Sequence, residues 1–224
     1  MPIHSRILHG VVNAPPVKKL LTENRLIVRA YFEQVYLKAD PYELETEPER
    51  LKFDEAFAML GAFRGARALE IGCGEGRLTR RLLPHADRIQ AFDLSANAIR
   101  RARRANPDPA RISYAVDDLL KSSLPRRAYD LVFCSEVLHY FSRTQLDQAI
   151  RRVLDFVVPG GLLLLVNSRA KSDDASGIDF KAFGARTILE RFESTGRLRL
   201  VDEASRELYR ISVGEVDVAV VDRV

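Results

Sequence analysis

The chain has 224 residues, of which 46% are hydrophobic and 29% are charged. These values are ordinary for a globular protein and exclude a disordered, fibrous or disulfide-stapled chain. Lysine and arginine together number 35 against 31 aspartates and glutamates, a balance too even to require an anionic partner.

The apolar runs, such as Leu162–Val166, are far shorter than the roughly 20 residues of a membrane-spanning helix, so we expect no membrane span. Residues 1–19 lack helical periodicity and the apolar stretch of a secretory signal, which predicts a loose arm. The only cysteines are Cys73 and Cys134. Two thiols without a secretory signal indicate a reduced, cytoplasmic protein.

Residues 20–62 predict a helical cover for the rest of the chain. Apolar side chains recur at helical spacing over Leu20–Leu37, and Asp40-Pro41 ends that helix. A second helix is predicted to begin at Glu47-Pro48, with proline and acidic residues in its first turn, and to end at Gly61.

From residue 63 to residue 224, short apolar runs alternate with amphipathic segments. The predicted strands are Arg67–Ile71, Arg88–Asp93, Ile112–Val116, Tyr129–Cys134, Gly161–Asn167, Arg197–Asp202 and Glu207–Val213. The predicted helices are Arg77–Leu83, Asn97–Ala105, Arg143–Phe156 and Ala185–Glu193. This alternation favours a parallel sheet with helices on both faces, and the last two strands are close enough to pair antiparallel. The prediction is one α/β domain with a doubly wound, mostly parallel sheet of seven strands.

Three glycines at alternate positions, Gly72, Gly74 and Gly76, directly follow the first predicted strand. Glycines at this point let the backbone turn sharply and let a ligand approach the main chain. A dinucleotide loop, as in an NAD-dependent enzyme, would carry its third glycine at position 77, where this chain has Arg77. Glu70 beside the loop would repel phosphates and attract an ammonium group. The loop therefore favours a cationic ligand over a dinucleotide.

Acidic residues also end the second and third strands. Asp93 can accept hydrogen bonds from a ribose diol, although it could instead cap the following helix. After the third strand, Asp118 or Asp117 can accept a hydrogen bond from an adenine amino group, and Leu119 can pack on the ring. The pleat decides which aspartate turns inward. We favour Asp118, with Asp117 as the alternative.

In this order, the motifs resemble the class I S-adenosylmethionine-dependent methyltransferases, which have a Rossmann-like fold. The matching segments are Glu70–Gly76, Asp93–Ser95, Asp118-Leu119, Tyr129–Leu138 and Pro159–Gly161. A looser match, outside these motifs, is to the nodulation protein S group of N-methyltransferases. It rests on Tyr31–Tyr36, Asp40–Tyr42, Glu49–Phe53 and Gly184-Ala185. His139-Tyr140 stands where that group tends to carry two aromatics, so its amino-sugar substrate is not carried over.

The resemblance implies S-adenosylmethionine as the cofactor and S-adenosylhomocysteine as its product. The methionine end would lie against the glycine loop, the ribose at Asp93, and the adenine between Leu94 and Asp118-Leu119. Residues after the fourth strand would line the sulfonium. The expected cofactor-binding residues are Glu70, Gly72, Cys73, Gly74, Gly76, Asp93, Leu94, Asp117, Asp118, Leu119, Cys134, Ser135 and Glu136.

The acceptor is expected to be a small molecule, and an amine is favoured because a neutral nitrogen lone pair can attack without a strong base. The alternative is an O-methyltransferase, in which His139 would act as general base. Tyr31 and Tyr36 are candidates for shaping the acceptor pocket and orienting the amine. The polar segment Arg169–Gly184 has the composition of a lid over the acceptor.

An RNA-modifying methyltransferase is a less favoured alternative. It would use four arginines of one predicted helix, Arg100, Arg101, Arg103 and Arg104. Neighbouring helical positions lie about 100° apart, so these side chains are spread around the helix, and no aromatic stacking motif accompanies them. We therefore expect a solvated face and no nucleic-acid partner. No cluster of histidine, cysteine and aspartate has metal-ligand spacing, so no metal is expected.

Overall fold

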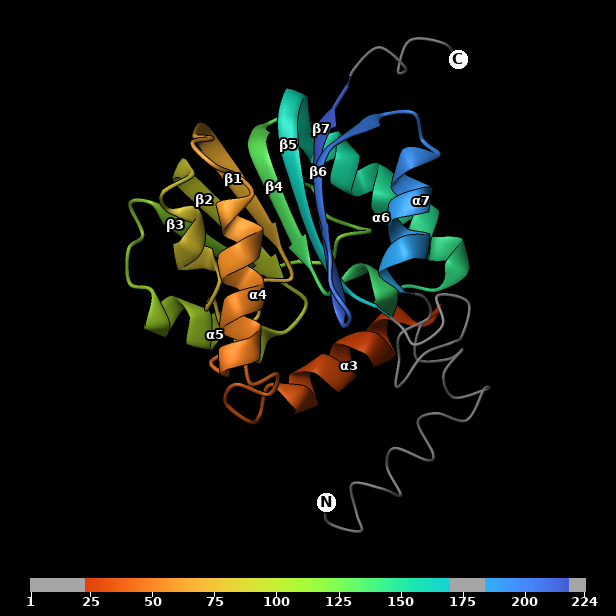
Figure 1. The fold of residues 1–224 in the computed structure, drawn as a ribbon. Coiled ribbons are helices and arrows are strands. Elements are labelled where there is room, and N and C mark those ends of the chain that lie inside the picture. The colour runs from red at the N-terminus through yellow and green to blue at the C-terminus, as the bar shows by residue number, and fades with distance from the viewer. Residues whose placement is uncertain (1–22, 170–183, 218–224) are drawn as a thin grey trace.

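The computed structural model describes residues 23–169 and 184–217, which build one mixed sheet with helices on both faces (Figure 1). Its strands run in the order β3-β2-β1-β4-β5-β7-β6. They are β1 (Gly65–Ile71), β2 (Ala86–Asp93), β3 (Ile112–Val116), β4 (Tyr129–Ser135), β5 (Val157–Ser168), β6 (Leu198–Ser205) and β7 (Tyr209–Val216). The pairs from β3 to β5 are parallel, whereas β7 pairs antiparallel with both β5 and β6. The predicted fold class is confirmed.

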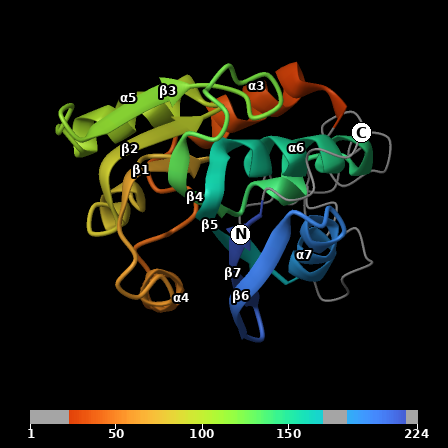
Figure 2. The same ribbon diagram turned by 90° about the horizontal axis from the view of Figure 1, so that it is seen from above.

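The described helices lie on the two faces of the sheet, except for α3, which lies at the carboxyl ends of the parallel strands. They are α3 (Arg25–Val35), α4 (Glu47–Ala58), α5 (Ala96–Ala105), α6 (Arg143–Phe156) and α7 (Ala185–Glu193), with 3₁₀ turns η1 (Thr79–Leu82) and η2 (Leu138–Tyr140). Helices α4 and α5 lie on one face and α6 and α7 on the other, as the view from above shows (Figure 2). In these ranges, no helix is both long and apolar enough to cross a membrane.

The central strands are apolar on both sides, as a sheet covered on both faces requires. Because side chains alternate along a strand, Leu69 and Ile71 of β1 join the core beneath α6 and α7, whereas Ala68 joins the core beneath α4 and α5. Phe53 and Phe57 of α4 enter that second core through one face of the helix. The two cores fix the carboxyl ends of the parallel strands at one edge of the sheet.

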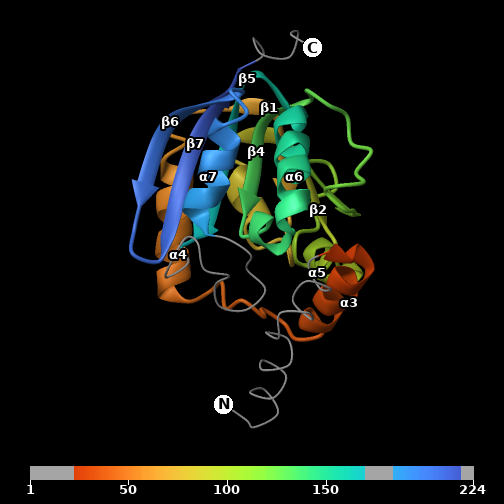
Figure 3. The ribbon, with the colours of Figure 1, turned by 90° about the vertical axis from the view of Figure 1, so that its right-hand side faces the viewer.

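Helix α3 crosses that edge, below the ends of the parallel strands in Figures 1 and 3. Its N-cap is Asn24, whose side chain accepts hydrogen bonds from the N–H groups of Leu26 and Ile27. The helix predicted over Leu20–Leu37 is therefore shorter than expected among the described residues, running from Arg25 to Val35. The chain then turns before α4, which begins at Glu47 as predicted.

The helix predicted over Arg77–Leu83 is wrong. The segment forms only the four-residue 3₁₀ turn η1, in which Thr79 and Leu82 are buried three positions apart, the period of a 3₁₀ helix. Pro84 follows at once and cannot donate a backbone hydrogen bond. The glycine loop is therefore not followed by an α-helical N-terminus. The predicted arm, residues 1–19, and the interior of the predicted lid, residues 170–183, lie outside the described residues.

Candidate active site

A cavity of about 270 Å³ lies where the carboxyl ends of the parallel strands meet the segments from α3 and α4. Its walls come from the glycine loop after β1, the ends of β2 and β4, the loop after β3, and helices α3 and α4. This is the edge at which open α/β sheets bind their ligands. The cavity joins the strand-end carboxylates that sequence analysis singled out.

The glycine loop shapes one wall of this cavity through backbone conformations that favour glycine. Gly72 and Gly74 have φ angles of 75° and 53°. A Cβ on Gly74 would lie 2.6 Å from the Tyr36 hydroxyl, and a Cβ on Gly72 would collide with the Val137 side chain. Glycine at these positions therefore lets Tyr36 and Val137 pack directly against the main chain of the loop, at the wall of the cavity.

Asp93 ends β2 with its carboxylate held from the main chain. One oxygen accepts from the Gly74 N–H at 3.0 Å and the other from the Ser95 N–H at 2.9 Å. Burial raises the pKa of this carboxyl to about 6, although these backbone hydrogen bonds act to lower it. A carboxylate has about four lone-pair sites, so it can still accept from a hydroxyl donor.

Glu70, near the end of β1, lines the cavity but is only 2% exposed. Its carboxylate accepts a hydrogen bond from the Thr79 hydroxyl. Burial, together with the neighbouring Asp93 charge, raises the pKa of Glu70 to about 8, against the effect of the Thr79 hydrogen bond. Two carboxylates with raised pKa values thus lie beside the glycine loop, and a cationic ligand would favour their ionised forms.

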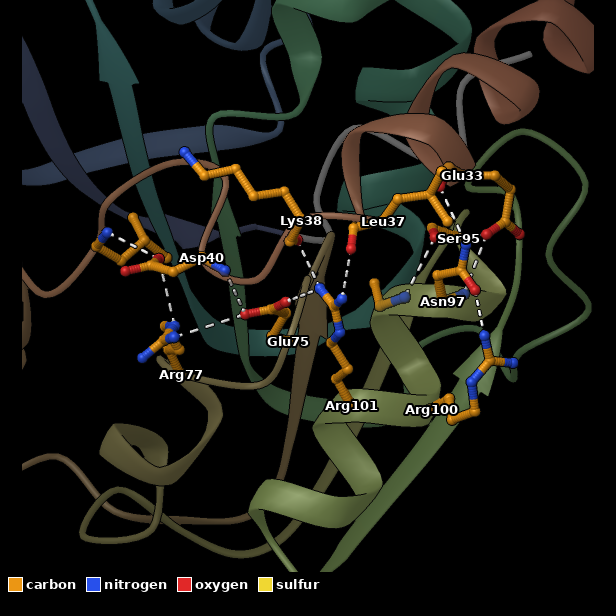
Figure 4. Close-up of polar contacts among 12 residues, drawn as sticks. Glu33, Leu37, Lys38, Asp40, Glu75, Arg77, Ser95, Asn97, Arg100 and Arg101 are labelled. Carbon is orange, nitrogen blue, oxygen red and sulfur yellow. Dashed lines mark hydrogen bonds and ion pairs between the residues drawn. The ribbon is translucent and has the colours of Figure 1, made fainter.

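Two carboxylates, those of Glu33 and Glu75, hold helix α3 and the connection between α3 and α4 over the site (Figure 4). Glu33 of α3 accepts hydrogen bonds from the Ser95 hydroxyl at 2.9 Å and from the N–H groups of Ala96 and Asn97 at 2.7 and 3.0 Å. Burial acts to raise the pKa of Glu33, but these hydrogen bonds outweigh it and lower the pKa. Glu33 therefore caps α5 from outside that helix.

Glu75 of the glycine loop makes the second fastening (Figure 4). Its carboxylate accepts from the Asp40 N–H at 3.0 Å and from the Arg101 guanidinium at 2.6 Å. Arg101 also donates to the carbonyls of Leu37 and Lys38, just beyond the end of α3. The loop, α5 and the connection between α3 and α4 are therefore held together through one carboxylate and one guanidinium.

The far end of the cavity holds a second group of charged side chains. Lys52 of α4 is only 5% exposed, and its Nζ lies 2.6 Å from Glu49 Oε2 and 3.9 Å from Glu136 Oε1. Glu136 follows β4, and it also accepts a hydrogen bond from the Ser168 hydroxyl at 2.6 Å. His139 Nδ1 lies 3.6 Å from Glu136 Oε2. Two carboxylates face one ammonium at this end.

The structure brings most of the predicted site residues to the cavity. The predicted residues that line it are Tyr36, Glu70, Gly72, Cys73, Gly74, Asp93, Leu94, Asp117, Leu119, Ser135 and Glu136. The lining residues that were not predicted from the sequence include the polar side chains of Arg25, Glu49, Lys52 and Ser168. Two sequence features could have indicated some of these residues. One is the Glu49–Lys52 pair, three positions apart and next to the apolar Phe53, and the other is the polar end of β5.

Five predicted residues are not among those that line the cavity: Tyr31, Gly76, Asp118, Cys134 and His139. The Asp118 carboxylate instead accepts two hydrogen bonds of 3.0 Å from the Arg25 guanidinium. A Cβ on Gly76 would point at Asn106 and Tyr114, away from the loop's open side. Cys134 and His139 are each 1% exposed, and Tyr31 packs edge-on against Phe32. His139 reaches the site through its contact with Glu136.

Comparison with known proteins identifies the family. A methyltransferase domain model matches residues 68–161. Nodulation protein S of Rhizobium tropici is 31% identical over 175 residues, which are 75% of this chain and 72% of that protein. The malonyl-[acyl-carrier protein] O-methyltransferase of Enterobacter lignolyticus is 30% identical over 134 residues, 60% of this chain and 51% of that protein.

Among solved structures, the N-methyltransferase NodS from Bradyrhizobium japonicum WM9, in complex with S-adenosylhomocysteine, superposes with a TM-score of 0.73. It is 26% identical, and the match covers 84% of this chain and 97% of that one. The glycine loop, the strand-end carboxylates and the cavity between them fit the same cofactor. The chain therefore belongs to the family of class I S-adenosylmethionine-dependent methyltransferases that includes nodulation protein S.

Proposed function

We propose that this methyltransferase acts on the amine nitrogen of a small-molecule acceptor. When bound, S-adenosylmethionine supplies the methyl group and leaves as the neutral thioether. The main chain of Gly72 and Gly74 would hold the methionine end. The free lone pairs of Asp93 would accept hydrogen bonds from the ribose hydroxyls. Asp117 and Leu119, which line the cavity, would take the adenine, in preference to Asp118.

The observation that carries the proposal is the charge at the far end of the cavity. There the carboxylates of Glu49 and Glu136 lie beside the Lys52 ammonium, so acidic side chains line this end of the cavity. An ammonium ion is attracted to such a site, and a partly buried site strengthens the attraction. A neutral hydroxyl would gain much less from it. Kinship with an N-methyltransferase supports the same acceptor class.

The residues of the chain act mainly by aligning the two reactants and by excluding water from the site. Helix α3 and the connection that follows it lie over the strand ends and are fastened there by Glu33 and Glu75. Tyr36, buried at the end of α3, holds its hydroxyl against Gly74. Alignment of two reactants in a site from which water is excluded contributes about 7–11 kcal/mol to a displacement reaction.

The test compares amines with alcohols of the same shape. The purified chain is incubated with S-adenosylmethionine and one acceptor at a time. The acceptors form two matched pairs, benzylamine with benzyl alcohol and cyclohexylamine with cyclohexanol. Formation of S-adenosylhomocysteine and of the methylated product are both measured. We expect the amine of each pair to be the methylated member. Methylation of the alcohols without the amines would contradict the proposal and favour O-methyl transfer.

A further inference from the structure

The order of the strands sets the direction in which the cofactor extends through the cavity. The carboxyl ends of β3, β2 and β1 follow one another along one edge of the sheet (Figure 1). The proposed function places the adenine beside Asp117 and Leu119 after β3 and the ribose at Asp93 after β2, so the rest of the cofactor reaches the glycine loop after β1. This part is the amino acid tail, which carries an ammonium and a carboxylate. The tail carboxylate therefore needs a hydrogen-bond donor near the glycine loop.

The basic side chains that line the cavity are already paired. Among the described residues they are Arg25, Lys52 and Arg77. Each forms an ion pair with an acidic side chain, at 3.0 Å for Arg25, 2.6 Å for Lys52 and 3.3 Å for Arg77. A ligand carboxylate would have to compete with these protein carboxylates for the same cations.

The Tyr36 hydroxyl differs from these groups because it reaches the glycine loop without a partner. Tyr36 lines the cavity and is only 7% exposed. Its hydroxyl lies so close to Gly74 that a Cβ on that glycine would be 2.6 Å away. Within residues 23–169 and 184–217, the Tyr36 hydroxyl makes no hydrogen bond. A buried hydroxyl is costly unless it is hydrogen-bonded, so this one is suited to a ligand that supplies the missing partner.

We propose, resting on the cofactor placement of the proposed function, that Tyr36 is a cofactor-binding residue whose hydroxyl donates a hydrogen bond to the carboxylate of the amino acid tail. Burial and the nearby charge of Asp93 raise the pKa of Tyr36 well above its usual value, so the hydroxyl keeps the proton that it donates. Glu75 is also near this hydroxyl, but it is paired with Arg101 at 2.6 Å, which reduces its repulsion of a ligand carboxylate.

The test determines which cofactor group depends on the hydroxyl. Dissociation constants are measured by calorimetry for S-adenosylhomocysteine and for its decarboxylated analogue, which keeps the ammonium and lacks the carboxylate. Both ligands are titrated into the wild-type chain and into Tyr36→Phe, and the melting temperature of each ligand-free chain is recorded. Tyr129→Phe is the matched control, because the Tyr129 ring is 1% exposed and its hydroxyl donates to Gln90 Oε1 at 2.6 Å.

We expect Tyr36→Phe to bind S-adenosylhomocysteine about tenfold more weakly, because one hydrogen bond to a charged group is lost. Its affinity for the decarboxylated analogue should change by less than about twofold, since that ligand has no carboxylate to lose. The melting temperature of Tyr36→Phe should not fall, because the removed hydroxyl had no partner. Tyr129→Phe should melt at a lower temperature and bind both ligands as the wild type does.

Equal weakening of both ligands, or no weakening of either, would overturn the assignment of Tyr36 to the carboxylate. A lower melting temperature for Tyr36→Phe would show that the hydroxyl is bound in the ligand-free chain, and this would overturn it too. Failure of the cofactor placement would instead appear as unchanged affinity in Asp93→Asn. No acceptor takes part in these measurements, so failure of the amine proposal is recognised separately, as methylation of the alcohols by the wild-type chain.

Discussion

Asp93 should make cofactor affinity depend on pH in a defined window. Its folded pKa is raised to about 6 by burial, and only the ionised carboxylate can accept both ribose hydroxyls while keeping its two backbone hydrogen bonds. With this pKa, about one molecule in eleven is ionised at pH 5 and about ten in eleven at pH 7. The apparent dissociation constant is divided by the competent fraction, so S-adenosylhomocysteine should bind about tenfold more tightly at pH 7 than at pH 5.

The stability of the ligand-free chain should respond in the opposite direction. The pKa of Asp93 rises from an ordinary value of 3.8 to about 6, so the folded chain binds more protons than the unfolded chain between these values. Its contribution is present below pH 3.8 and is lost as pH rises to about 6, a change of about 3 kcal/mol at most. The pKa of Glu70 rises from 4.5 to about 8, so Glu70 adds a loss of stability of the same sign between these values, and comparison with Asp93→Asn isolates the Asp93 contribution.

Both responses are measured on wild type and on Asp93→Asn, by calorimetry with S-adenosylhomocysteine and by thermal melting without it. We expect Asp93→Asn to bind the ligand about tenfold or more weakly at pH 7, with little further loss at pH 5. The difference in stability between the two chains should change across the window. A wild-type affinity that does not change with pH, or a pH dependence that survives in Asp93→Asn, would refute the assignment of Asp93 to the ribose.

Three further predictions test other parts of the site. Gly74→Ala places a Cβ 2.6 Å from the Tyr36 hydroxyl at a φ of 53°, so calorimetry should show weaker S-adenosylhomocysteine binding and melting should show a loss of about 1–2 kcal/mol. Glu75→Gln loosens the connection after α3, so a protease should cleave there sooner, whereas an unchanged cleavage rate would argue against the fastening. His139→Asn should lower amine turnover only in part and leave S-adenosylhomocysteine affinity unchanged, whereas loss of all turnover would favour the O-methyltransferase alternative, in which His139 is the general base.

The central site could be predicted because its signals are local. The apolar strands, the alternate glycines and the acid at each strand end are adjacent in sequence, and parallel pairing brings the strand ends to one edge. Asp93 and Val116 are register partners, so the ends of β2 and β3 lie side by side as expected. Cys73 and Leu94 line the cavity because each directly adjoins one of these signals.

The choice between the two aspartates after β3 could not be predicted in the same way. It depends on the pleat and on Arg25, a residue far away in sequence that belongs to a different element. Arg25 also lies over the Phe141 ring, with its guanidinium carbon 4.5 Å from the ring centroid. With Asp118 engaged by this guanidinium, Asp117 is the aspartate that lines the cavity.

The end of the cavity that holds Lys52 and Glu136 could not be predicted from the sequence motifs either. Lys52 is a charged residue next to a buried stripe of α4, and such a residue is usually exposed. Its burial follows from the position of α4 against the sheet, which brings it to Glu136. The left-handed backbone of Glu136 has no signal in its residue type. Long-range packing, and not local pattern, therefore builds this end of the site.

The most direct test is a crystal structure of the chain with S-adenosylhomocysteine. We predict that the ribose hydroxyls contact Asp93, that the adenine lies against Leu119 beside Asp117, and that the sulfur faces the end of the cavity that holds Glu136. A ligand bound outside this cavity, or one whose ribose makes no contact with Asp93, would contradict the account.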